Sequence, residues 1–149
     1  MANTVIPIGA DHRGFALKTR FVTWLNTHGF QAKDLGAHSA DRCDALDIAK
    51  AMAEDFNAHA LQFGVLICGT GQAMAMTANR YKSLRAALCT NPEMARLARE
   101  HNDANVLALG ADITPPDAAL QIFEVFLGTE ALGGRYAERR DRLNLLGGL

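Results

Sequence analysis

One segment of the sequence places a thiol immediately before two glycines. Cys68 is followed by Gly69, Thr70 and Gly71. A thiol at the end of an apolar segment can reach a crevice, and backbone N–H groups at the start of a following helix can receive negative charge. The alternative is a buried structural cysteine, because free Cys is among the most buried residue types. The glycines lack the pattern of a dinucleotide or phosphate-loop motif, so this segment does not predict nucleotide binding.

Two histidines with polar neighbours are candidates for moving protons. Asp11 and His12 are adjacent and could form a hydrogen-bonded acid/base pair, or they could cap a helix. His101 precedes Asn102 and Asp103, and an imidazole beside an amide and a carboxylate could shuttle protons. The alternative for this second group is a polar turn.

Arg135 and Arg139 are the candidate phosphate ligands. They are four residues apart, so on a helix they share one face and could together clamp a phosphate; the alternative is a solvated basic surface.

The five histidines and three cysteines show no metal-ligand spacing of the Cys-x-x-Cys or His-Glu-x-x-His type. The sequence therefore predicts no metal site. It also does not predict a hydrolase of the common kind, because no Gly-x-Ser-x-Gly segment is present.

Alternating strands and helices must position these residues. Apolar residues three and four apart predict helices, as with Leu17 and Phe21 or with Ile48 and Met52. Further helices are expected over residues 73–80, after the pair Asn91-Pro92, after residues 114–117, and from 135 to about 146. Short apolar runs predict strands at residues 5–9, 30–35, 63–68, 85–89 and 105–110.

This alternation predicts an α/β fold, a Rossmann-like three-layer α/β/α arrangement with a parallel sheet of about five strands and a C-terminal helix. The 149 residues fit one domain, which we expect to span residues 1–149. Ligands bind outside the carboxyl ends of parallel strands. Asp11 and Cys68 follow the first and third strands, and the loop after the fourth leads into the helix that ends near His101. We therefore expect these groups to meet in one crevice.

Composition and charge restrict the partners. Fifteen basic and sixteen acidic residues give a net charge of −1, so no overall positive field would attract nucleic acid or an anionic membrane. No stretch approaches the roughly 20 apolar residues of a membrane span, and residues 1–4 lack the pattern of a secretory signal. Three cysteines without a Cys-x-x-Cys pair suit reduced thiols. We expect a cytoplasmic protein.

Five segments of the chain share their order and spacing with a known family. They are GADHRGF at 9–15, LICGTG at 66–71, ANR at 78–80, REHNDANV at 99–106 and GGR at 133–135. Together they resemble the ribose-5-phosphate isomerase B family over nearly the whole chain. The resemblance implies an aldose–ketose isomerase that moves one proton between neighbouring carbons of a sugar phosphate through a cis-enediolate. It also implies no cofactor and a homodimer, which could pair into a tetramer, in which two chains complete each site.

The resemblance implies catalytic roles for four residues. Cys68 matches the catalytic base, and a thiolate near backbone N–H donors can take a proton next to a carbonyl when its pKa approaches the working pH. Thr70 matches a hydroxyl beside the sugar oxygens, and Asp11 matches a carboxylate that assists there. His101 matches the residue that opens the furanose ring.

Six further residues match substrate-binding positions. Gly69 and Gly71 match an anion hole, in which fixed amide dipoles would hold the enediolate oxygen. Asn102 matches a substrate-binding amide. The residues that match phosphate ligands are His12, Arg135 and Arg139, and the two arginines are expected near the site of the opposite subunit.

Four positions depart from the family's pattern. Ala45 stands in place of an aromatic residue, Ala73 in place of a glycine, Asp112 in place of a phosphate-binding arginine, and Tyr136 in place of a histidine. A Cβ on Ala73 could narrow the approach to the enediolate, and an acid at 112 would repel a phosphate. Losing one of three phosphate arginines would cost about 1.5–3 kcal/mol, roughly tenfold to a hundredfold in binding.

These departures keep two alternatives open. The same chemistry could act on a tetrose or hexose phosphate, or on a sugar without phosphate. The chain could also be a non-catalytic sugar-phosphate-binding paralogue or one subunit of a hetero-oligomer, although a pure binder needs no base and ring-opening group together. The isomerase interpretation requires the sulfur of Cys68 to face a crevice, with the imidazole of His101 on the same side of the molecule.

Overall fold

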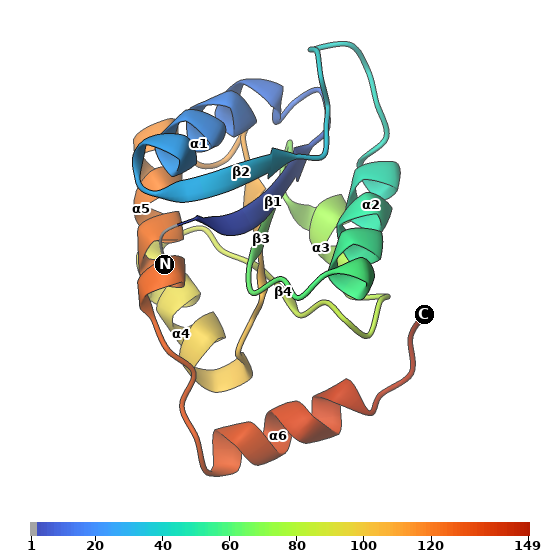
Figure 1. The fold of residues 1–149 in the computed structure, drawn as a ribbon, viewed down its shortest axis with the longest axis vertical. Coiled ribbons are helices and arrows are strands. Elements are labelled where there is room, and N and C mark those ends of the chain that lie inside the picture. Colours follow the sequence, from blue (N-terminus) through green and yellow to red (C-terminus); the bar gives the residue numbers. More distant parts are fainter. Residues whose placement is uncertain (1–2) are drawn as a thin grey trace.

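A five-stranded parallel sheet forms the centre of the computed structural model, which describes residues 3–149 (Figure 1). Met1 and Ala2, where the polar N-terminal segment begins, lie outside the described residues. The strands stand in the order β2-β1-β3-β5-β4, and every neighbouring pair is parallel. Their bounds are β1 (Thr4–Ala10), β2 (Phe30–Asp34), β3 (Gly64–Cys68), β4 (Ala86–Leu88) and β5 (Val106–Gly110). The predicted α/β class and strand number are confirmed.

Helices cover both faces of the sheet. α1, α4 and α5 lie on one side, at the left in Figure 1, and α2 and α3 lie on the other. Within residues 3–149 no helix combines the length and the apolar character needed to cross a bilayer. The helix bounds are α1 (Phe15–Thr27), α2 (Ala45–Ala58), α3 (Gln72–Ala78), α4 (Pro92–Asn102), α5 (Pro116–Gly128) and α6 (Arg135–Asn144).

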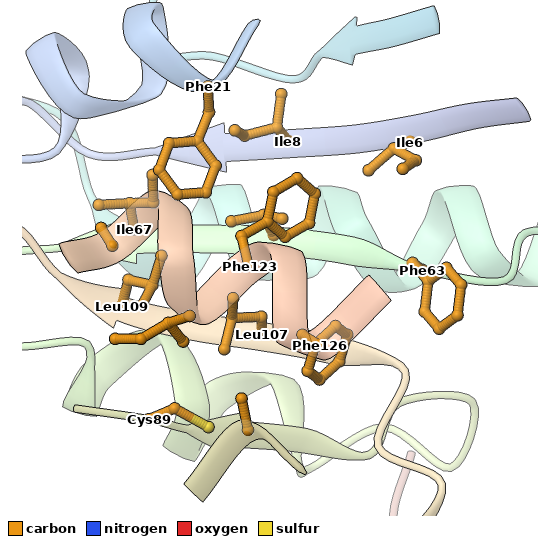
Figure 2. Packing of buried hydrophobic residues seen from close by; sticks show 14 of the residues in the cluster. Ile6, Ile8, Phe21, Phe63, Ile67, Cys89, Leu107, Leu109, Phe123 and Phe126 are labelled. Carbon is orange, nitrogen blue, oxygen red and sulfur yellow. The ribbon is translucent and has the colours of Figure 1, made fainter. Parts of the chain in front are cut away.

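Alternate side chains of the central strands fill two separate cores. In β3, Ile67 belongs to the core under α1 and α5, whereas Leu66 and Cys68 belong to the core under α2 and α3. Figure 2 shows the first core, in which the rings of Phe21 and Phe123 lie with their centroids 5.2 Å apart. Because helices bury both faces, the central strands are apolar throughout rather than alternating.

Helix ends follow the signals in the sequence. Asn91 caps α4, since its Oδ1 accepts a hydrogen bond from the backbone N–H of Met94 at 2.9 Å, and Pro92 occupies the first turn. Gly29 follows α1 with φ of +84°, the left-handed conformation expected of a glycine after a helix.

α6 extends away from the sheet layers, at the bottom of Figure 1, and contains no buried residue. The tail after α6 returns to the body of the chain, where the backbone N–H of Leu149 donates to the carbonyl of Arg80 at 2.7 Å. Three leucines of this tail remain largely exposed: Leu145, Leu146 and Leu149. The predicted C-terminal helix is therefore present, with an apolar tail beside it.

Candidate active site

Cys68 is the last residue of β3, and its sulfur contacts the glycine turn that follows. The backbone N–H of Gly71 donates to Cys68 Sγ with a nitrogen–sulfur distance of 3.2 Å. Cys68 is only 4% exposed, so the sulfur of a single chain is buried at the sheet edge. A thiolate is a hydrogen-bond acceptor, and a main-chain N–H directed at the sulfur is a suitable partner for it.

Two glycines allow this turn to form. Gly71 has φ of +79°, a conformation that residues with a Cβ rarely adopt. A Cβ at this position would also lie 2.5 Å from a methyl carbon of Leu88 and 2.9 Å from the carbonyl carbon of Leu109. Gly110 leaves room for the backbone of Thr70, which a Cβ on Gly110 would approach to 2.6 Å. The close packing of the turn on β5 therefore fixes the direction of the Gly71 N–H.

Asp11 and His12 follow β1 and brace the loop beside this turn. The Oδ1 atom of Asp11 accepts hydrogen bonds from the backbone N–H groups of Arg13 at 2.9 Å and Gly14 at 3.1 Å. These bonds brace the loop before α1 but do not cap the helix, since no side chain caps α1 at its N-cap residue Gly14. They hold a carboxylate that is only 7% exposed. The Nδ1 atom of His12 lies 3.4 Å from both the backbone nitrogen and the carbonyl oxygen of Cys43. The imidazole thus joins the loop after β1 to the loop before α2.

The carboxyl ends of β1 and β3 bring these residues together. The two strands are adjacent, and the backbone N–H of Asp11 donates to the carbonyl of Ile67 at 3.1 Å. β2 lies on one side of this pair, and β5 and β4 lie on the other, so the strand order reverses between β1 and β3. Open parallel sheets bind ligands at the carboxyl ends of the strands where this reversal occurs. We call the following residues the carboxyl-edge group: Asp11, His12, Cys68, Gly69, Thr70 and Gly71.

A second group forms where α4 ends beside α6. Nη2 of Arg139 donates to the carbonyl of His101 at 3.2 Å and to Oδ1 of Asn102 at 3.0 Å. The ring of His101 stacks on Tyr136, with centroids 4.4 Å apart and planes 1° from parallel. Arg135 completes a surface hollow of about 370 Å³ with His101, Tyr136 and Arg139. We call these five residues the amino-edge group, and its two guanidinium groups suit an anionic ligand.

The two groups lie at opposite edges of the sheet, which corrects the expectation of one crevice within a chain. Cys68 pairs with Gly110, the last residue of β5. A helix that connects parallel strands must return the chain from the carboxyl edge to the amino edge, so α4 ends with His101 close to Val106, the first residue of β5. The length of a five-residue strand, about 13 Å, separates the edges. Within one chain, His101 cannot act on a substrate held at Cys68.

The other two cysteines have different surroundings. Burial raises the pKa of the Cys89 thiol to about 11, so Cys89 is a structural residue of the core. Cys43 is half-buried in the loop that contacts His12. Within residues 3–149, no three His, Cys, Asp or Glu side chains form a group that could hold a metal ion.

The positions that depart from the family pattern have partners of their own. Asp112 forms an ion pair with Arg13, whose Nη2 lies 2.9 Å from Asp112 Oδ2. Ala45 is 8% exposed at the start of α2 and packs into the core under α2 and α3. Tyr136 contacts His101 as described. No sequence pattern pairs Arg13 with Asp112, because the two residues are far apart in the chain.

Comparison with known proteins decides the family. The family model described as Ribose/Galactose Isomerase matches residues 6–143. The chain belongs to the ribose/galactose isomerase family. It is 36% identical to ribose-5-phosphate isomerase B of Escherichia coli over 141 residues, which cover 95% of each chain. It is 38% identical over 142 residues to a probable ribose-5-phosphate isomerase B of Mycoplasma pneumoniae, covering 95% of this chain and 93% of that protein.

Solved structures in the ribose/galactose isomerase family have the same fold. Ribose-5-phosphate isomerase B of Clostridium thermocellum matches with a TM-score of 0.92 and 40% identity over 95% of both chains. A ribose 5-phosphate isomerase of Thermotoga maritima matches with a TM-score of 0.92 and 38% identity, covering 96% of this chain and 99% of that one. The predicted family is confirmed, and with it the class of enzyme, a sugar-phosphate isomerase that interconverts aldoses and ketoses.

Proposed function

We propose that this chain interconverts ribose 5-phosphate and ribulose 5-phosphate through a cis-enediolate, with Cys68 as the base. The hydrogen bond from Gly71 to Cys68 Sγ carries the proposal, because it directs a main-chain N–H at the sulfur of the proposed base, at the edge of the sheet where this fold binds ligands. The names of the relatives supply the substrate. We also propose that residues 1–149 act as one domain, and that the enzyme works in the cytoplasm, since its three cysteines are free.

The proposed reaction is a proton transfer between neighbouring carbons. The sulfur of Cys68 takes the proton from the carbon beside the carbonyl, so a C–H bond breaks, an S–H bond forms and the electron pair moves to the carbonyl oxygen. The Gly71 amide faces the sulfur, so we assign the enediolate oxygen to the amide of Gly69 and to the backbone that follows Gly71. Thr70 and Asp11 would contact the sugar oxygens. The hydroxyl proton on the second carbon's oxygen passes to the first oxygen, and the sulfur returns its proton to the neighbouring carbon. The S–H bond breaks, a new C–H bond forms and the carbonyl group now stands on the second carbon, which completes the isomerisation.

We propose that a second copy of the chain supplies the amino-edge group, because one chain holds its two groups at opposite edges. His101 of that copy would open the furanose ring, and Asn102 would bind the sugar. Its Arg135 and Arg139, with His12 of the first chain, would bind the phosphate. A two-fold axis would create two such sites at once. The unburied α6 and the exposed leucines of the tail offer surface for this homodimer.

Replacement of the base tests the chemistry. Cys68→Ala should abolish isomerisation and the exchange of the substrate's C2 hydrogen with deuterated solvent, because the substitution removes the sulfur that takes the proton. The fold should survive, which circular dichroism and thermal unfolding would check. Isomerisation at the wild-type rate by Cys68→Ala would show that another group is the base.

Mixing two inactive variants tests whether two chains share a site. Cys68→Ala and His101→Ala should each be inactive alone. Random exchange of subunits would make half of the dimers mixed, each with one intact site, so the mixture should recover about a quarter of the wild-type activity. If both groups worked within one chain, mixing would restore nothing.

The second candidate substrate is another aldose, with the same chemistry. Ala45 favours it, because a small buried residue there leaves no aromatic wall beside a sugar. A panel of phosphorylated and free aldoses of four to six carbons, each assayed with the purified chain alone, would rank the candidates by kcat/KM. Turnover without an added partner would also exclude a purely binding role.

A further inference from the structure

An ion pair crosses the glycine turn next to Cys68. Arg13 comes from the loop after β1 and Asp112 from the loop after β5, and Nη2 of Arg13 lies 2.9 Å from Oδ2 of Asp112. Both loops are tied to the turn. The backbone N–H of Asp112 donates to the carbonyl of Gly69 at 2.9 Å, and that of Ala111 donates to the carbonyl of Cys68 at 2.8 Å.

Gly69 shows how closely the pair covers the turn. A Cβ built on Gly69 would lie 2.9 Å from Oδ2 of Asp112 and 3.0 Å from Nη1 of Arg13. Both charged groups therefore pass directly over the backbone of the residue that follows Cys68. A substrate whose reacting carbons meet the sulfur would have these two side chains as neighbours.

The charges of the pair favour Arg13 as the group that meets an anion. The carboxylate of Asp112 would repel an anion, but the guanidinium already neutralises it. A guanidinium has five N–H donors in a planar fork, and contact with one carboxylate oxygen leaves others for a ligand. The Arg13 side chain is 59% exposed, so those donors can be reached from solvent.

We propose that Arg13 binds the phosphate of the sugar substrate and that Asp112 is a positioning residue that holds Arg13 over the turn. This assignment rests on the proposed function, since it takes the substrate to be a phosphorylated sugar. A carboxylate alone at position 112 would repel a phosphate. Under this proposal Asp112 instead supports phosphate binding, because it holds Arg13 in place. The positive charge comes from the loop after β1, and the acid fixes its place.

Substitutions in both residues test the assignment. Arg13→Gln should weaken the binding of inorganic phosphate, measured by calorimetry, and raise KM for ribose 5-phosphate, each by roughly tenfold or more. Its kcat should change little, because Arg13 does not take part in proton transfer. In the Arg13→Gln chain Asp112 becomes an unpaired repelling charge. Adding Asp112→Asn should therefore tighten phosphate binding more in that chain than in the wild type.

Arg20→Gln is the matched control. Arg20 also pairs with an aspartate across two elements, at 3.0 Å from Asp117, and is 51% exposed, but it lies on the outer part of α1. Exposed pairs contribute little to stability, so both single variants should unfold near the wild-type temperature. Arg20→Gln should leave phosphate binding and KM unchanged.

The outcomes separate this proposal from the proposed function. If Arg13→Gln behaves like Arg20→Gln while the wild type isomerises ribose 5-phosphate, the role of Arg13 is wrong and the function stands. If phosphate binding depends on Arg13 but ribose 5-phosphate is not turned over, Arg13 is an anion ligand and the substrate is wrong. A wild-type chain that binds neither phosphate nor ribose 5-phosphate overturns both.

Discussion

At the scale of single residues, Gly71 limits what the candidate site can tolerate. Its positive φ aims the N–H at Cys68, and its missing side chain lets the turn pack against Leu88 and Leu109. One residue thus satisfies a conformational demand and a packing demand at once. A substitution must violate both.

Gly71→Ala should lower the free energy of unfolding by about 2–4 kcal/mol, from a strained left-handed alanine and from overpacking. Isomerase activity should also be lost, because the N–H would turn away from the sulfur. Urea denaturation and a coupled activity assay would measure the two effects. Gly128→Ala is the control, because nothing lies within 4 Å of a Cβ at Gly128. Equal stability of the two variants would contradict the role given to Gly71.

Tyr136 is the residue that organises the amino-edge group. Its ring stacks on His101, its hydroxyl accepts a hydrogen bond from Arg135 Nη2 at 3.1 Å, and the guanidinium of Arg139 lies 5.5 Å from its centroid. Tyr136→Phe should keep the stacking and most activity, whereas Tyr136→Leu should reduce kcat/KM by about tenfold through loss of one aromatic contact. Steady-state kinetics would compare the two. The same loss in both variants would locate the effect in the hydroxyl instead.

At the scale of elements, a buried ammonium joins α1 to the end of β2. Lys18 is 1% exposed and donates to Asp34 Oδ1 at 2.6 Å and to the carbonyl of Ala37. Burial by itself would raise the pKa of Asp34, but hydrogen bonds from Lys18 and Gly36 outweigh burial, so this pKa lies below its ordinary value. The loop from β2 toward α2 therefore depends on an ionised Asp34.

The pH dependence of stability follows from this shift. A lowered pKa in the folded state means that the interaction stabilises the fold above the unfolded pKa of about 3.9. This stabilisation is lost as pH falls through that value and then through the lower folded pKa. Urea titrations between about pH 6 and pH 3 should show a smaller acid loss for Lys18→Met than for the wild type. Parallel curves would mean that the pair does not link protonation to folding.

Most of these elements could be predicted from the sequence, because caps and apolar periodicity are local. Asn91 and Gly29 marked the helix ends, and the apolar run before Cys68 marked a strand buried on both faces. The error concerned His101. A helix between parallel strands must end at the amino edge, so the alternation itself already placed His101, in the last turn of α4, away from Cys68. The rule for the carboxyl ends of strands does not apply to a residue at the end of such a helix.

Two other features could not be read from sequence patterns. Arg13 and Asp112 are far apart in the chain, and their pairing depends on the adjacent ends of β1, β3 and β5. Asp11 offered two roles, an acid/base pair with His12 or a helix cap, and the geometry of the loop shows instead that its Oδ1 braces the backbone before α1. The sequence motifs identified the candidate site residues, and the order of the strands in the sheet determines which of these residues are in contact.

At the scale of the whole molecule, the sheet separates the carboxyl-edge group from the amino-edge group. The proposed activity therefore belongs to a pair of chains. Dilution should reduce the activity per chain as the dimer dissociates, in parallel with a fall in molar mass measured by light scattering or mass photometry. A monodisperse single chain with full activity would contradict this.

The same separation has a genetic consequence. An allele that damages one of the two groups still supplies the other group intact, so a dimer of its product with a normal chain keeps one working site. An allele that damages both groups supplies neither, so a dimer of its product with a normal chain has no working site. Whether a defect is recessive or dominant would therefore depend on whether its mutations fall in one group or in both, the carboxyl-edge group with Cys68 and the amino-edge group with His101. The number of mutations would matter less.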